Sequence, residues 1–191
     1  MNWWDGLVVL FTGKHVAILG PRMAGKTTLY DFLETGTVDR ATQRKQNVGV
    51  EPRKRARRKD LGLSIRKGAD VPGKDTYYPD WQKLFVRAHI VFYLFDAHMA
   101  RTDDEYRGRL TRDSRKLREW GVDGKSIYVI GTHKDTDPLA SQRPDADYAD
   151  HILDLDVIEA FRSRVRAASV VVGAMITDES TNELLRGALG R

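Results

Sequence analysis

The sequence predicts an α/β fold with a mainly parallel sheet, and two observations indicate it. Short runs rich in apolar and β-branched residues recur at 15–20, 63–71, 89–97, 126–132 and 168–175. Longer segments with helical spacing lie between most of these runs. Because successive residues of the runs are apolar, the runs suit strands that are buried on both faces of a parallel sheet.

The helical segments carry recognisable end signals. One segment ends at Gly36, a residue type favoured just beyond a helix. Another opens with Thr102 three residues before Glu105, the spacing of a capping box. The expected helices cover residues 25–36, 102–121, 148–167 and 180–189.

Composition limits the class of protein. The 191 residues are 41% hydrophobic and 31% charged, which fits one globular domain, and no apolar run approaches the roughly 20 residues needed to span a bilayer. The chain has no cysteine, so disulfides and thiolate chemistry are excluded, and a cytoplasmic location is expected. The net charge is +5, but residues 40–59 hold nine Lys and Arg against one Glu, so the basicity belongs to one segment.

A phosphate-binding motif lies between the first predicted strand and the first predicted helix. The pattern GxxxxGK[ST] occurs at residues 20–27. Its glycines let backbone amides turn around phosphate oxygens, Lys26 neutralises the β and γ charge, and Thr27 can bind Mg²⁺. A glycine-rich turn is the alternative. We expect nucleotide contacts from Gly20, Arg22, Met23, Ala24, Gly25, Lys26, Thr27 and Thr28.

A second motif, DxxG, follows the strand predicted at 63–71. Asp70 can hold the Mg²⁺ shell through water, and the Gly73 amide can meet a γ-phosphate. Alone, this pattern is more often a turn. Its position after the phosphate-binding motif favours the functional interpretation.

Two further motifs concern the base of the nucleotide. Thr132, His133 and Asp135 stand in the pattern [NT]KxD, in which a carboxylate accepts two hydrogen bonds from guanine and would lack one donor against adenine. A surface loop is the alternative. At the end of the last predicted strand, the Ala174 amide would approach the guanine oxygen, with Met175 beside it.

These four motifs, in this order, resemble those of the Ras-like small GTPases, and the Arf (ADP-ribosylation-factor-like) branch fits best. The stretch DVPGKDTYYPDW, beginning at Asp70, resembles the pattern DVGGQxxxRPLW of that branch, and MAGKTTL resembles its AAGKTT. The stretch QNVGVE is similar to its TIGFNVE. The resemblance implies a P-loop NTPase G domain over residues 14–191. It also implies three α/β/α layers, a six-stranded sheet with one antiparallel strand, and GTP/GDP and Mg²⁺ as ligands.

The chain departs from this family at the residue expected to orient the attacking water. Lys74 stands where these proteins have Gln, and an ammonium cannot accept a proton from water in the same way. We therefore expect Lys26, Gly73 and Lys74 to support only slow or partner-dependent hydrolysis. Arg22 replaces a glycine of the Ras-like motif, and it acts either as a charge stabiliser or as a steric change.

The third metal ligand is the least defined residue of the predicted magnesium site. Thr27 and Asp70 are two of its members, and we choose Thr42 as the third. Thr35 and Thr37 are alternatives, and alignment on NVGVE places Asn47 there instead.

The N-terminal segment is predicted to be an addition to the domain. Residues 1–13 form an expected amphipathic helix, with Trp3, Trp4 and Leu7 among its apolar residues. Asn2 replaces the glycine that would be myristoylated, so membrane contact would rest on residues 1–11 themselves. Permanent packing on the domain or on a partner is the alternative.

The basic strip at 52–59 is either a solvated hairpin or a surface for anionic partners. Because no aromatic residue lies within it, nucleic acid ranks behind anionic lipid and acidic protein.

The sequence as a whole predicts a cytoplasmic GTP/GDP switch, peripheral at a membrane if its first helix binds lipid. Effector and regulatory proteins would bind its switch regions. The alternatives are a pseudo-GTPase that has lost catalysis and a nucleotide-regulated adaptor of a membrane or a protein.

Overall fold

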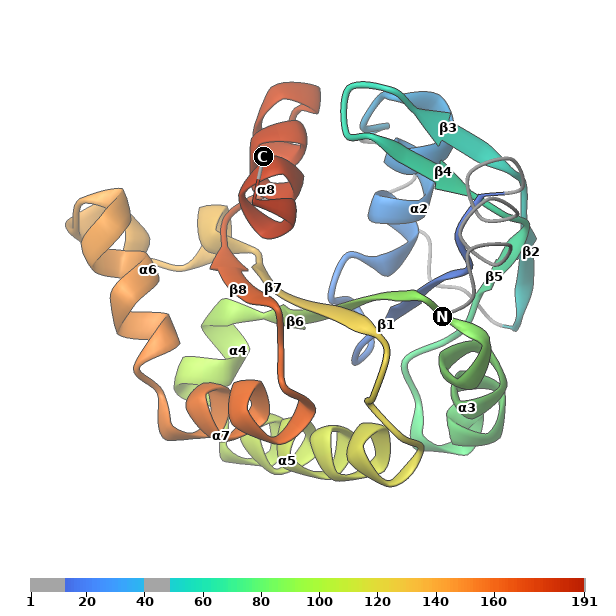
Figure 1. Ribbon diagram of the computed structural model, residues 1–191. Coiled ribbons are helices and arrows are strands. Elements are labelled where there is room, and N and C mark those ends of the chain that lie inside the picture. The colour runs from blue at the N-terminus through green and yellow to red at the C-terminus, as the bar shows by residue number, and fades with distance from the viewer. Residues whose placement is uncertain (1–12, 40–48, 191) are drawn as a thin grey trace.

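Four parallel strands form the centre of the molecule, in the order β1-β6-β7-β8 (Figure 1). The computed structural model describes residues 13–39 and 49–190. The strands are β1 (Val16–Leu19), β6 (Ile90–Asp96), β7 (Ser126–Thr132) and β8 (Ser169–Val172). The prediction of an α/β fold with a parallel sheet is confirmed.

The remaining strands form two small antiparallel pairs instead of extending that sheet. They are β2 (Glu51–Arg53) with β5 (Gly68–Asp70), and β3 (Ala56–Arg58) with β4 (Leu63–Ile65). Among the described residues the central sheet therefore has four hydrogen-bonded strands, whereas six were predicted. The single strand predicted at 63–71 is wrong as well, because the polar pair Arg66-Lys67 separates β4 from β5 and the two halves pair with different partners.

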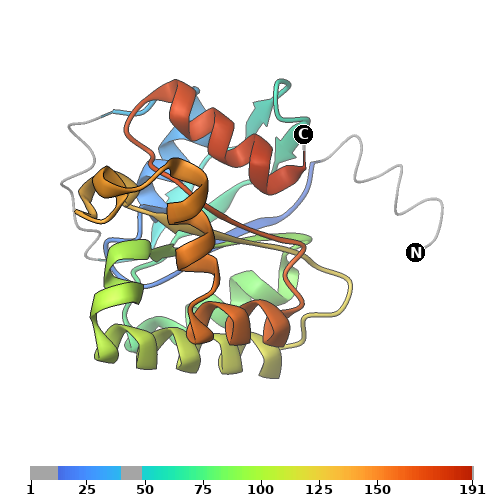
Figure 2. The ribbon, with the colours of Figure 1, turned by 90° about the vertical axis from the view of Figure 1, so that its left-hand side faces the viewer.

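Helices cover both faces of the central sheet. In Figure 1, α2 and α8 lie on one face, and α3, α5 and α7 lie on the other. Figure 2 shows α5 and α7 side by side beneath the sheet. The helices are α2 (Lys26–Thr35), α3 (Tyr78–Arg87), α4 (Ala97–Thr102), α5 (Asp104–Glu119), α6 (Asp145–Leu153), α7 (Asp156–Val165) and α8 (Asp178–Leu189).

The alternation of side chains along the strands divides the core into two halves. Ala17 and Leu19 of β1 belong to the cluster under α3, α5 and α7. Val16 and Ile18 of the same strand belong to the cluster under α2 and α8. All four are buried, as expected for a strand covered on both faces. In contrast, every residue of the edge strand β8 is only partly buried.

Of the predictions for helices, one end is confirmed, one start is wrong, and one helix is divided into two. Gly36 caps α2 with φ 84°, and its amide donates to the Phe32 carbonyl. The capping box at Thr102 is wrong: Asp103 caps α5, and its carboxylate accepts from the Tyr106 amide at 2.9 Å. The single helix predicted at 148–167 is two helices, because the chain is extended at Leu155 and α7 starts afresh there.

Several predictions fall outside the described residues. The N-terminal helix at 1–13, with its membrane contact, lies there apart from Gly13, and so do Thr42 and Asn47. Within residues 13–39 and 49–190, each helix is too short or too polar to cross a lipid bilayer.

Candidate functional site

The carboxyl ends of the four parallel strands meet at one edge of the sheet, and the predicted motifs follow them there. Loop 20–25 follows β1, loop 133–139 follows β7, and residues 173–175 follow β8. Ligand sites of open parallel sheets form at this edge. The topology therefore brings together three segments that are distant in the sequence.

Loop 20–25 has a backbone that requires glycine at both ends. Gly20 has φ 144°, and a Cβ there would lie 2.1 Å from the Leu94 carbonyl oxygen. Gly25 has φ 84° and forms the N-cap of α2 without a side-chain cap. Between them Met23 has φ 60°, an uncommon value for a residue with a side chain. The loop thus curls tightly onto the N-terminus of α2, where amides favour an anion.

Lys26, the first residue of α2, is a buried cation directly after this loop. The residue is only 7% exposed, and Nζ donates to the Pro21 carbonyl oxygen at 2.6 Å. Burial lowers the pKa of Lys26 to about 8, and the nearby Asp70 carboxylate opposes this shift only in part. An anion bound in the loop would stabilise the ammonium form.

Thr27 and Asp70, predicted as members of one metal site, are in direct contact. Thr27 Oγ1 donates to Asp70 Oδ2 at 2.7 Å, and Asp70 is 1% exposed. The hydroxyl and carboxylate oxygens suit Mg²⁺. The described residues contain no cluster of three His, Cys, Asp or Glu side chains that could hold a metal ion. Nucleotide phosphates would therefore have to supply further ligands, as is usual for Mg²⁺ in such sites.

The segment after Asp70 lies directly on loop 20–25. A Cβ at Gly73 would come within 2.3 Å of the Pro21 carbonyl carbon and 2.4 Å of the Arg22 amide nitrogen. Trp81 anchors this segment from below, because its indole N–H donates to the Pro72 carbonyl oxygen at 3.1 Å and the ring is fully buried. Lys74, the next residue after Gly73, is exposed.

Two side chains of the THKD motif bind the backbone of loop 20–25. Thr132 Oγ1 lies 3.2 Å from the Ala24 carbonyl oxygen and 3.0 Å from that of Phe95. His133 Nε2 lies 2.6 Å from the Met23 carbonyl oxygen, so in this contact Nε2 carries the hydrogen. His133 itself has φ 61°. The two loops are therefore held together by side-chain to backbone hydrogen bonds.

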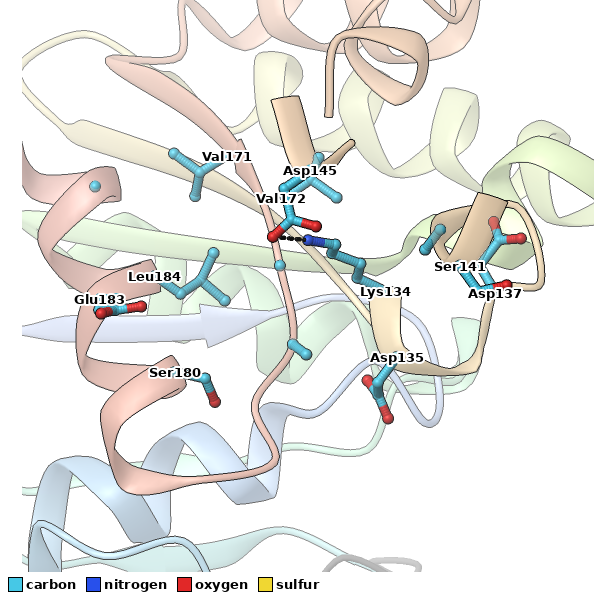
Figure 3. Close-up of a pocket in the computed structure, with 14 residues that line it drawn as sticks. Lys134, Asp135, Asp137, Ser141, Asp145, Val171, Val172, Ser180, Glu183 and Leu184 are labelled. Atoms are coloured by element: carbon cyan, nitrogen blue, oxygen red, sulfur yellow. Dashed lines mark ion pairs between the residues drawn. The ribbon is translucent and has the colours of Figure 1, made fainter. Parts of the chain in front are cut away.

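A pocket of about 630 Å³ adjoins these loops on the side of β8 and α8. Asp135 and Ala174 line it, as do Lys134, Asp145 and Glu183. Figure 3 shows Lys134 directed toward Asp145, with which it forms an ion pair at 2.6 Å, while Asp135 points away from that pair. Asp135 and Ala174 thus share one pocket, whereas the residues of loop 20–25 and the other predicted base-side residues, Thr132, His133 and Met175, lie outside its lining.

Asp137 anchors loop 133–139 and was missed in the sequence. Its carboxylate accepts from Arg101 at 2.6 and 3.1 Å, from the Leu139 amide at 2.9 Å and from Tyr148 at 3.1 Å. Burial alone would raise the pKa of Asp137, but these hydrogen bonds outweigh it and hold the pKa at about 2. A sequence signal existed, since Asp137 directly precedes Pro138, but nothing local pointed to Arg101.

A second buried carboxylate ties the segment after Gly73 to α5. Asp113 is fully buried and accepts from Tyr78 at 2.5 Å, Tyr93 at 2.6 Å and Arg109 at 2.7 Å. Burial raises the pKa of Asp113 despite these donors. Arg109 also forms an ion pair with Asp75. This network was not predicted, because its members are spread over nearly forty residues.

The remaining predicted residues take less central positions. Arg22 and Met23 are exposed, and Thr28 is buried in the first turn of α2. Thr35 Oγ1 donates to the Asp31 carbonyl oxygen and contacts Thr37. Because Thr35 lies about 12 Å from Thr27 along the helix axis, it does not share a metal site with Thr27 in this structure. The Met175 side chain lies against Gly25.

Comparison with known proteins leaves the family open: no protein-family model matches the chain, and no curated protein matches it significantly.

Proposed function

We propose that this chain is a guanine-nucleotide switch with a P-loop G domain of the Ras-like type. The observation that carries the proposal is the pair of contacts from Thr132 and His133 to the backbone of loop 20–25. These contacts fix the loop with the proposed base reader, Asp135, against loop 20–25, which directly precedes the proposed phosphate binder, Lys26. A nucleotide carries a base at one end and phosphates at the other. Its binding site therefore needs two recognition elements at a fixed position relative to each other.

On the phosphate side, Lys26 and the amides of loop 20–25 would neutralise the phosphate charge. The buried ammonium supports this role, because it has one carbonyl partner in the structure and a lowered pKa. Thr27 and Asp70 would hold Mg²⁺, which when bound neutralises charge between the β- and γ-phosphates. The Gly73 amide lies beside the loop and would sense the γ-phosphate.

On the base side, the Asp135 carboxylate would accept from the N1 and N2 hydrogens of guanine, and the Ala174 amide would donate to its oxygen. Both residues line the same pocket, which supports the assignment. Adenine offers an acceptor where the carboxylate needs a donor, so ATP would bind more weakly than GTP.

The hydrolysis step is expected to be slow. Lys74, in the place of the expected Gln, follows Gly73 and is exposed. Its ammonium has three donors and no acceptor, and therefore cannot take a proton from water while charged. Effector or regulatory proteins would bind the segment around Lys74.

The decisive experiment identifies the nucleotide that co-purifies with the protein and measures the affinities for GDP, GTP and ATP. The proposal predicts guanine nucleotide and a preference for GTP over ATP of at least about 100-fold. Equal binding of ATP and GTP, or of neither, would contradict it.

Two variants of carboxylates that line the same pocket sharpen this test. Asp135→Asn should shift the preference from guanine to xanthine nucleotides, because the amide can donate where the carboxylate accepts. The matched control is Asp145→Asn, whose carboxylate is exposed and paired with Lys134. The control should leave the preference for guanine unchanged.

A second candidate function is a pseudo-GTPase that uses nucleotide occupancy as a structural state. The exposed Lys74 in the place of the water-orienting residue favours it. Multiple-turnover measurements separate the two functions. Phosphate release that continues beyond one equivalent supports a GTPase, and its absence with tightly bound GTP supports the pseudo-enzyme.

A further inference from the structure

Arg53 connects the predicted metal site to two other elements of the fold. From β2 its Nη2 donates to Asp70 Oδ2 at 3.0 Å, and its Nη1 donates to Asp31 Oδ1 on α2 at 2.5 Å. The guanidinium also lies 5.2 Å from the centre of the Tyr30 ring. The side chain is only 11% exposed. Arg53 is therefore partly buried and paired with carboxylates of its own fold, although it comes from the basic strip that was predicted to be a solvated hairpin or a surface for anionic partners.

The sheet register places Arg53 directly opposite Gly68 in the β2-β5 pair. Among the described residues, a Cβ at Gly68 would meet only the Val16 carbonyl oxygen at 3.8 Å and the Tyr30 hydroxyl at 3.9 Å. The position of the guanidinium is therefore defined by its bonds to Asp70 and Asp31 and not by the glycine opposite.

The position of the guanidinium bears on metal binding. Asp70 Oδ2 accepts from both Thr27 and Arg53, so the carboxylate of the proposed Mg²⁺ site already has a cation on it. A divalent cation placed at Thr27 and Asp70 would lie beside this positive charge in a buried, weakly screened environment. The two cations would repel each other strongly there.

We propose that Arg53 is a positioning residue that holds the Asp70 carboxylate in the metal-free site, and that Mg²⁺ displaces it. This inference rests on the proposed nucleotide function. Displacement breaks the side-chain bridge from β2 to Asp70 on β5 and so removes one of the contacts that hold β2 in place. Binding of Mg²⁺ with nucleotide and release of β2 are therefore linked, and by reciprocity any partner that holds β2 in place weakens Mg²⁺ binding.

A purely structural ion pair predicts something different. A buried Arg53 that only stabilises the fold would change stability when it is replaced, but not the effect of Mg²⁺ on nucleotide affinity. It would also leave β2 equally protected, or better protected, once a ligand is bound, because ligands of the native state suppress opening.

The first test uses the unaltered protein. Amide hydrogen exchange of a peptide covering residues 51–58 is measured with GDP and EDTA, and again with GDP and Mg²⁺. The inference predicts exchange about tenfold faster with Mg²⁺ in this peptide. Equal or slower exchange would overturn it.

The second test compares two arginines of the same strip. The ratio of the GDP dissociation constants in EDTA and in Mg²⁺ is measured for Arg53→Gln and for the exposed control Arg57→Gln. Loss of the competing cation should raise this ratio about tenfold in Arg53→Gln, while Arg57→Gln stays within twofold of the unaltered protein. An unchanged ratio in folded Arg53→Gln would overturn the inference.

The following outcomes separate a failure of this inference from a failure of the proposed function. If Arg53→Gln does not fold, Arg53→Lys keeps the charge but cannot bridge both carboxylates, and the hydrogen-exchange result on the unaltered protein still decides. If the unaltered protein binds no GDP at any Mg²⁺ concentration, the proposed function fails and this inference fails with it. If GDP binds but the ratio ignores Arg53, only this inference fails.

Discussion

The two loops of the candidate site each depend on a buried charge, and the two charges are compensated very differently. Lys26, directly after loop 20–25, donates to the Pro21 carbonyl oxygen, and burial lowers its pKa to about 8. Asp137 in loop 133–139 has four donors, and they hold its pKa at about 2. The comparison separates a buried charge with few partners, for which we propose a ligand, from a buried charge whose hydrogen bonds are supplied within the fold.

The largest expected effect on stability follows from replacing Asp137. Asp137→Asn should lower the free energy of unfolding by about 4 kcal/mol, because it leaves Arg101 without its carboxylate. Chemical denaturation measures this loss. The control Asp145→Asn removes an exposed carboxylate and should cost less than about 0.5 kcal/mol. Similar losses in both variants would break the distinction between the two kinds of charge.

Replacement of Lys26 should change the free energy of unfolding in the opposite direction. Lys26→Met removes a buried charge and keeps a similar volume, so the nucleotide-free protein should gain about 3 kcal/mol of stability at pH 7 while losing nucleotide affinity. The same denaturation experiment measures it. The control Lys83→Met, at an exposed position, should change neither quantity. A loss of stability in Lys26→Met would show that the ammonium is scaffold too.

The pH dependence of the stability gained in Lys26→Met tests whether the Lys26 ammonium is the cause. The folded pKa of Lys26 is about 8 against about 10.5 for the free side chain, so between these values the unfolded chain binds more protons. The stability of the unaltered protein should therefore rise through this interval relative to Lys26→Met. We expect most of the difference between the two proteins, about 3 kcal/mol, to vanish by pH 10.5. A constant difference would mean that Lys26 does not titrate as proposed.

The smallest expected effect concerns the contact between the loops. Thr132→Val keeps the shape of the side chain but removes its bonds to Ala24 and Phe95, so stability should fall by about 1 kcal/mol. Affinity for GDP should fall about fivefold, because loop 133–139 is then less firmly placed. Thr111→Val, which loses a bond within α5 only, serves as control for GDP affinity. Equal GDP affinities in the unaltered protein, Thr132→Val and Thr111→Val would show that the loop contact does not contribute to nucleotide binding.

The fold was predictable to the extent that it is local. Apolar β-branched runs located all four parallel strands, and Gly36 marked the end of α2. The split between α6 and α7 was missed because Leu155 keeps the helical spacing although its backbone is extended. The small sheets were missed because three-residue strands carry too little periodic pattern to distinguish them from turns.

The site was predictable where backbone geometry dictates the residue type. Gly20, Gly25 and Gly73 each stand where a Cβ would collide with a neighbouring group. The charged partners were not predictable, since Arg53 meets Asp70 only through the pairing of β2 with β5, which are fifteen residues apart in the sequence. Such partners depend on tertiary contacts, so the spacing of residues along the sequence does not indicate them.

Gly73 also has a consequence for protein engineering. Because even one added methyl group at this position meets the backbone of Pro21 and Arg22, the neighbouring chain has no flexible side chain that could yield. Gly73→Ala would therefore act as a wedge between the two segments. It offers a way to trap the protein in one arrangement and to recover the molecules that bind that arrangement alone.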